Sequence, residues 1–148
     1  MADMKTDKAG ASVVLGVLNV LALLKPKIHV VGLMALTENM PGEGAYKPGD
    51  ILTTFNGKTV EIIHTDAEGR LILADALGYS QKYSPSLIID IATLTGACAI
   101  ALGRFHAGIF SNDKSLIEEL FFYGQKTNEK VWPMPLTDDY DDMIKSDV

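Results

Sequence analysis

The sequence has little of what several classes of protein need. A single cysteine, Cys98, in 148 residues excludes an internal disulfide, so no oxidising compartment is indicated and we expect a cytoplasmic protein. Cys98 lies in a small, apolar segment, which favours a buried, inert thiol over a nucleophile. The formal charge is −6, and lysine and arginine are not clustered, so we expect neither nucleic acid nor an anionic membrane as a partner.

The sequence also lacks a convincing targeting or membrane segment. Residues 13–24 are apolar, but Asp3 and Asp7 cancel the positive charge before them, and no A-x-A cleavage site follows. About a dozen apolar residues are too few to cross a bilayer. We therefore expect a core helix here and not a signal peptide.

Several motifs of enzyme chemistry are missing. His29, His64 and His106 form neither an H-x-x-H nor an H-E-x-x-H spacing, which excludes the usual zinc-protease signatures. There is no Gly-x-Ser-x-Gly elbow, P-loop or Rossmann fingerprint. Any metal would have to be bound mainly by oxygen ligands.

The sequence does contain the pattern of a globular α/β domain. Its composition, 47% hydrophobic and 22% charged residues, is that of one domain with a continuous core, and no linker divides it. The patterning predicts helices over residues 9–24, 70–83 and 116–126, and apolar strands over residues 28–36 and 87–92. Asn56-Gly57 predicts a hairpin over residues 51–63 with a type I′ turn. Strands that alternate with helices, several of them apolar on both faces, predict an α/β layered sheet.

Two carboxylates lie where open α/β sheets place their sites, between a strand and a helix. If that stretch is extended, Asp66 and Glu68 point the same way, and Arg70 follows in the first turn of the helix, where it could hold an anion. The D-x-E spacing is also common on plain surfaces. Asp7, at the entry to the first helix, is on position alone an acid that stabilises the helix dipole.

Larger segments resemble one family. The run Thr65-Asp66-Ala67-Glu68-Gly69-Arg70-Leu71 resembles the N-T-D-A-E-G-R-L signature of the leucyl aminopeptidase (cytosol aminopeptidase) family. Further matches follow in the same order along the chain. They are Met4-Lys5-Thr6-Asp7, Val31-Gly32-Leu33, Glu38-Asn39-Met40-Pro41, Lys47-Pro48-Gly49-Asp50, Asn56-Gly57-Lys58-Thr59, Ala92-Thr93-Leu94-Thr95-Gly96-Ala97 and Trp132-Pro133-Met134-Pro135-Leu136.

The resemblance implies roles for the matching residues. Asp7, Asp66 and Glu68 would bind two divalent ions, Zn²⁺ or Mn²⁺, with Glu68 bridging them. Arg70 would help catalysis by holding a bicarbonate. Met4, Thr93 and Leu94 would contact a peptide with a free amino terminus, although packing and hydrogen bonding are their ordinary alternatives. The fold would be α/β of the zinc-peptidase type, with three αβα layers around a mixed, mostly parallel sheet that is incomplete in this chain. Relatives form homo-hexamers.

The chain also departs from the family pattern. The upstream segment that supplies a lysine and an aspartate ligand and a second, catalytic lysine is absent, as is the family's N-terminal domain. We therefore expect residues 1–148 to be a partial catalytic domain that is inactive alone. His64 replaces the usual asparagine, which leaves the preferred substrate residue open. The alternative is a non-catalytic assembly or interaction module derived from the same fold.

Overall fold

The computed structural model describes residues 2–147, which divide into two compact units. The first unit ends at Leu94, and the second comprises Thr95–Asp147. All of the carboxylates and substrate contacts expected from the sequence therefore fall in the first unit, together with Arg70.

The first unit begins with a 3₁₀ turn, η1 (Ala2–Lys8), which leads into helix α1 (Ala9–Leu24) and confirms the helix predicted over residues 9–24. The helix ends at Lys25, which takes the left-handed conformation (φ 49°) and donates its amide to the Leu21 carbonyl at 2.8 Å. Pro26 follows and prevents continuation.

Helix α1 is covered on one face only. Gly10 is its one buried residue among those described, whereas Leu15 and Leu23 are 59% and 75% exposed, so the expected burial holds for that face alone. The helical run Asp3–Leu24, 22 residues long, is apolar enough to cross a membrane by length and composition, a test that buried core helices and N-terminal signal sequences also pass.

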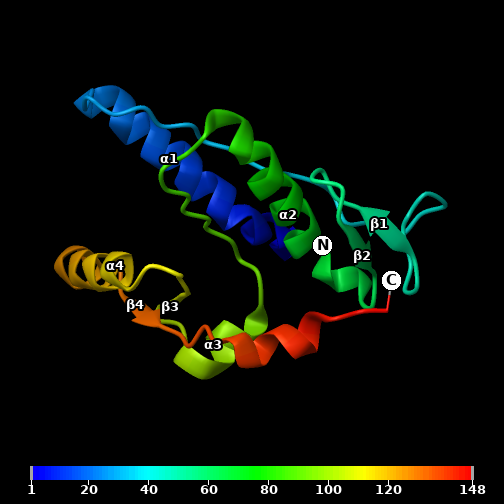
Figure 1. Ribbon diagram of the computed structural model, residues 1–148. Helices are drawn as coiled ribbons and strands as arrows, with labels where there is room; N and C mark the ends of the chain where they lie inside the picture. Colours follow the sequence, from blue (N-terminus) through cyan, green and yellow to red (C-terminus); the bar gives the residue numbers. More distant parts are fainter. Residues whose placement is uncertain (1, 148) are drawn as a thin grey trace. The chain divides into compact units, whose positions relative to one another are not determined.

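Two extended segments lie against this helix. A Cβ on Gly32 would lie 2.6 Å from Leu18 Cδ1, so residues 28–36 run back along α1 (Figure 1). A Cβ on Gly10 would lie 1.9 Å from the Ile91 carbonyl oxygen, which places residues 87–92 against the start of the helix.

The prediction of strands over residues 28–36 and 87–92 is wrong for this structure. Both segments are without β-ladder pairing, and their apolar side chains stay accessible, with Val30 43% and Ile89 53% exposed. A strand needs hydrogen bonds to a neighbouring strand, and an apolar, β-branched sequence does not supply that neighbour.

A hairpin of strands β1 (Ile51–Thr53) and β2 (Thr59–Glu61) confirms the hairpin predicted around Asn56-Gly57. The strands are antiparallel, with Leu52 opposite Val60. The expected type I′ turn is wrong, because that turn needs positive φ at two successive residues and only Gly57 has it (φ 84°). Instead Gly57 closes a turn by donating its amide to the Thr54 carbonyl at 2.8 Å.

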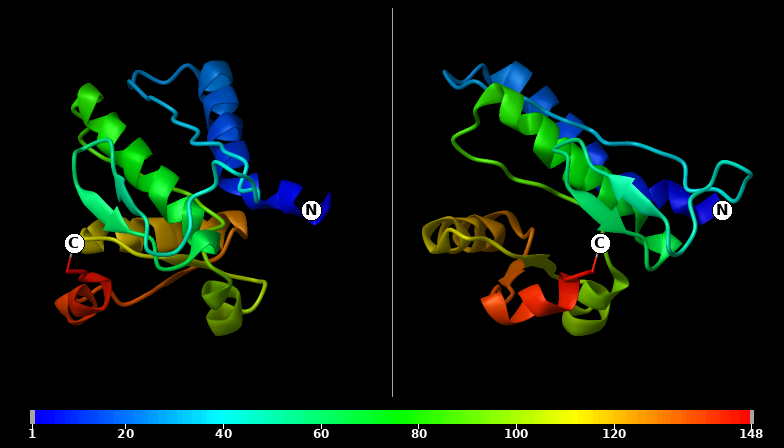
Figure 2. Two further views of the ribbon diagram at one scale, coloured as in Figure 1. Left: turned by 90° about the vertical axis from the view of Figure 1, so that its right-hand side faces the viewer. Right: turned by 45° about the vertical axis from the view of Figure 1, so that its right-hand side comes forward.

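The hairpin tip packs against helix α2 (Glu68–Ser80), which is followed by a 3₁₀ turn, η3 (Gln81–Tyr83). The Phe55 amide donates to Asp75 Oδ1 at 2.7 Å, and the Phe55 and Tyr79 rings meet edge to face at 5.5 Å. Figure 2 shows the hairpin beside this helix from two sides. The helix predicted over residues 70–83 is confirmed, but the α-helix starts two residues earlier and ends at Ser80, and the 3₁₀ turn η3 covers the remainder.

The second unit contains helix α3 (Gly96–Leu102), strand β3 (Ala107–Ile109), helix α4 (Lys114–Thr127), strand β4 (Val131–Pro133) and a 3₁₀ turn, η4 (Asp138–Ile144). Strands β3 and β4 are parallel, and α4 connects them. Trp132 of β4 packs edge to face on Phe121 of α4, with ring centroids 6.0 Å apart. Helix α4 confirms the helix predicted over residues 116–126.

The described strands thus form two separate two-stranded sheets, one antiparallel and one parallel. Mixed helix and strand agree with the expected α/β class. The three-layer arrangement with a mostly parallel sheet stays a prediction.

Candidate metal and substrate site

The two signature carboxylates lie in a helical turn at the start of α2. The 3₁₀ turn η2 (Thr65–Ala67) holds Asp66 at φ −85°, ψ 18°, and Glu68 is the first residue of the α-helix. His64 initiates the turn, because its Nδ1 accepts the Asp66 amide at 3.1 Å. The expectation that Asp66 and Glu68 share one face of an extended segment is therefore wrong. Glu68 instead gains a favourable position near the positive end of the helix dipole.

The loop after residues 28–36 holds this turn through two side chains. Asn39 Nδ2 donates to Glu68 Oε2 at 3.0 Å and to the Thr65 carbonyl at 3.2 Å. The Tyr46 hydroxyl donates to the same Thr65 carbonyl at 3.0 Å. The loop and the turn are thus connected by three hydrogen bonds, one of which acts directly on a candidate ligand.

The electrostatics around Tyr46 report on both carboxylates. Partial burial raises the pKa of the Tyr46 hydroxyl, and the negative charges of Glu68 and Asp66 raise it further. Both acids therefore lie close enough to Tyr46 to act on it through one local field.

Asp7 lies beside the candidate substrate contacts. Thr93 Oγ1 donates to Asp7 Oδ1 at 2.8 Å, which joins η1 to the end of the second extended segment. Leu94 approaches the start of α2, where its Cδ1 would lie 3.5 Å from a Cβ on Gly69. Met4, also in η1, is 55% exposed.

The described residues contain no ready-made cluster of metal ligands. Among residues 2–147, no group of three or more His, Cys, Asp or Glu side chains is close enough to hold an ion. The donors themselves, carboxylate oxygens of Asp7, Asp66 and Glu68, suit Zn²⁺ and Mn²⁺. Arg70, the third residue of α2, is exposed.

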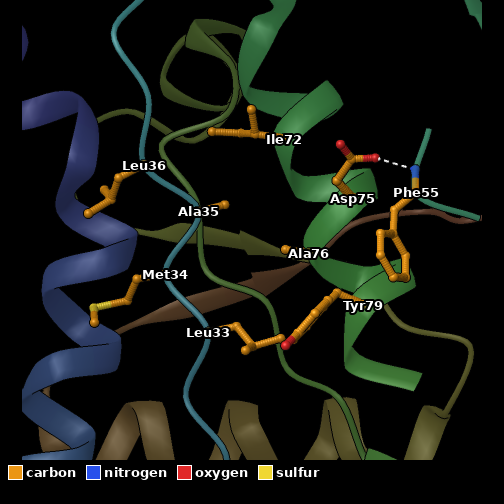
Figure 3. Close-up of a pocket in the computed structure, with 9 residues that line it drawn as sticks. All are labelled: Leu33, Met34, Ala35, Leu36, Phe55, Ile72, Asp75, Ala76 and Tyr79. Carbon is orange, nitrogen blue, oxygen red and sulfur yellow. Dashed lines mark hydrogen bonds between the residues drawn. The ribbon is translucent and has the colours of Figure 1, made fainter. Parts of the chain in front are cut away.

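A separate apolar cavity of about 340 Å³ lies between residues 33–36, the hairpin tip and α2 (Figure 3). Its wall includes Leu33, Phe55, Ile72 and Tyr79, and its one charged group, Asp75, is engaged by the Phe55 amide. The expected site residues do not line it.

Analysis of single residues missed Asn39 and Tyr46. Asn39 stands in the Glu38-Asn39-Met40-Pro41 match, and that match was the available signal for it. Tyr46 precedes a Lys-Pro-Gly-Asp segment and carries no motif of its own.

Comparisons with known proteins give the class of the molecule. The model of the cytosol aminopeptidase family, catalytic domain, matches residues 1–148. The chain therefore belongs to the cytosol aminopeptidase family.

Similar proteins carry the same description. The chain is 57% identical to a probable cytosol aminopeptidase of Chlorobaculum tepidum and 57% identical to one of Chlorobium limicola, each over 149 aligned residues covering 100% of the chain. It is 51% identical to a probable cytosol aminopeptidase of Geobacter sulfurreducens over 148 residues, again 100% of the chain. The chain spans about 30% of the length of each of these relatives.

Proposed function

We propose that this chain forms part of the catalytic domain of a metal-dependent, leucine-preferring aminopeptidase that removes N-terminal residues from peptides. The observation that carries the proposal is the family match over residues 1–148, which includes the Asp66 and Glu68 turn. The substrate would be a peptide with a free amino terminus, and the protein would act in the cytoplasm.

Asp7, Asp66 and Glu68 would act as ligands of two divalent ions, Zn²⁺ or Mn²⁺, with Glu68 bridging them. When bound, two such metal ions polarise the scissile carbonyl and lower the pKa of a water molecule toward neutrality. The hydrogen bonds from Thr93 to Asp7 and from Asn39 to Glu68 support the proposal, because metal-binding carboxylates are usually oriented by such partners.

Arg70 would be the catalytic residue of this segment. Its guanidinium is planar and permanently charged, which suits a bicarbonate bound beside the first turn of α2. Arg70 would hold this bicarbonate, which would supply a group able to exchange protons, and the positive charge of Arg70 would offset negative charge on the substrate.

Met4, Thr93 and Leu94 would border the bound peptide. Thr93 is already oriented by Asp7, and Leu94 lies against the start of α2, so both are adjacent to the proposed ligands. His64 would adjoin the same region and influence which N-terminal residue is preferred.

The isolated chain should be inactive, because Asp7, Asp66 and Glu68 provide only part of the ligands that two ions need. Each missing ligand or orienting partner costs roughly tenfold or more in metal affinity. The complete enzyme would be a homo-oligomer, with a hexamer as the expected assembly.

A chimera tests the function directly. Residues 1–148 replace the matching segment of the Chlorobaculum tepidum relative, which is 57% identical over that segment, after the parent protein is shown to cleave leucine p-nitroanilide with Mn²⁺. We expect the chimera to cleave the substrate and Glu68→Ala to abolish cleavage. A folded, assembled chimera without turnover contradicts the proposal.

The second candidate is an assembly or interaction module of the same fold. The exposed apolar side chains of residues 28–36 and 87–92 favour it, since such surfaces commonly contact other chains. A module would give a chimera that folds and assembles but has no turnover with either wild-type Glu68 or its variant.

A further inference from the structure

We propose that Asn39 is a positioning residue that holds the carboxylate of Glu68 in one orientation at the start of α2. The inference rests on the proposed function in one respect, that Glu68 is a metal ligand. The contact itself is independent of any metal: Asn39 Nδ2 donates to Glu68 Oε2 at 3.0 Å.

The chemistry of the contact requires an amide. Asn39 Nδ2 carries two hydrogens, and the structure gives it two acceptors, the Glu68 carboxylate and the Thr65 carbonyl. The opposite orientation of the Asn39 amide is excluded, because it would place the Asn39 oxygen against two other acceptor oxygens. A carboxylate at position 39 would supply no donor and would repel Glu68.

The contact uses one side of the carboxylate and leaves the other available. Glu68 Oε2 receives the bond from Asn39, and Oε1 keeps its lone pairs for an ion. Hydrogen bonds to a charged acceptor are shorter and stronger than neutral ones, so this bond can restrict a side chain that otherwise samples several rotamers.

Asn39 and Tyr46 perform different tasks on the same turn. Both donate to the Thr65 carbonyl, but only Asn39 also reaches the Glu68 side chain. Loss of Tyr46 should therefore loosen the turn without releasing the carboxylate, whereas loss of Asn39 should release the carboxylate. This difference separates positioning from general stabilisation.

The rotamer of Glu68 is the direct readout, measured by three-bond NMR couplings on the full 148-residue chain without metal. We expect one dominant rotamer in the wild type, in Tyr46→Phe and in Asn19→Ala, a control on the exposed face of α1. In Asn39→Ala and Asn39→Asp the Glu68 side chain should populate several rotamers and give averaged couplings. Averaged Glu68 couplings in the wild type overturn the proposal. So does averaging in Tyr46→Phe that equals the averaging in the Asn39 variants.

Mn²⁺ affinity is the second readout. Asn39→Ala should weaken binding by roughly 10- to 100-fold, the range typical of partners that orient metal ligands. The effect should vanish when Glu68 is already Gln, because Asn39 acts through Glu68. Equal loss in both backgrounds overturns the positioning role. Absence of Mn²⁺ binding in the wild type counts against the proposed function, while the rotamer result still decides the role of Asn39.

Discussion

Thr93 donates a hydrogen bond to Asp7 across 86 residues of sequence, with 2.8 Å between Oγ1 and Oδ1. The contact brings a proposed metal ligand and a proposed substrate contact together at the start of helix α1. A change at Thr93 should therefore act through Asp7.

Thr93→Val removes the donor and keeps the shape of the side chain. We expect the free energy of unfolding to fall by about 0.5 kcal/mol, a small value because both groups are exposed. Urea denaturation followed by circular dichroism measures this change. Thr93→Ser retains the hydroxyl and should behave as wild type, and an equal loss in both variants would show that the methyl group matters and the hydrogen bond does not.

Gly10→Ala tests the packing of the second extended segment on α1. The new Cβ would lie 1.9 Å from the Ile91 carbonyl oxygen, so backbone must move, and we expect a loss of about 1–3 kcal/mol in unfolding free energy. Gly16→Ala in the same helix meets nothing within 4 Å and should gain up to about 1 kcal/mol. Gains at both positions in chemical denaturation would contradict the close approach.

Asp113 caps helix α4 and should make its stability depend on pH. Its Oδ1 accepts the Ser115 and Leu116 amides, and hydrogen bonds from the Ser115 side chain and these amides lower the pKa of the carboxyl group. A lowered pKa contributes stability above the unfolded value near 4, and the contribution is lost as the pH falls through the folded pKa. Asp113→Asn keeps an acceptor but does not titrate. Thermal unfolding between pH 6 and pH 2 should therefore show a steeper acid loss in the wild type than in Asp113→Asn, and parallel curves would count against the cap.

The isolated chain should not hydrolyse leucine p-nitroanilide with added Zn²⁺ or Mn²⁺. The reason is that Asp7, Asp66 and Glu68 form an incomplete ligand set. Release of p-nitroaniline is followed by absorbance, with Glu68→Ala as the matched control. Turnover above that control would show that residues 1–148 are sufficient.

Local signals in the sequence predicted the helices well. Helices α1 and α2 follow from apolar spacing and from the breakers Lys25-Pro26 and Ser84-Pro85, which are all local in the chain. The strands over residues 28–36 and 87–92 depend on partners distant in sequence, and apolar composition cannot supply them.

The candidate site shows the same division. The signature run identified Asp66 and Glu68 from the sequence, but the His64 side chain turns that stretch into a helical start, which changes how the two acids are presented. Asn39 lies 29 residues before Glu68, so their hydrogen bond could not be seen from spacing.

The central claim, that Asp66 and Glu68 bind metal, is tested most directly by Mn²⁺ titration of the chain, followed by the electron paramagnetic resonance signal of free Mn²⁺. The account predicts that the wild type and Glu43→Gln, a change to an exposed loop acid, lower the free signal, whereas Asp66→Asn and Glu68→Gln lower it much less because they bind Mn²⁺ more weakly. Equal binding by all four proteins would contradict it.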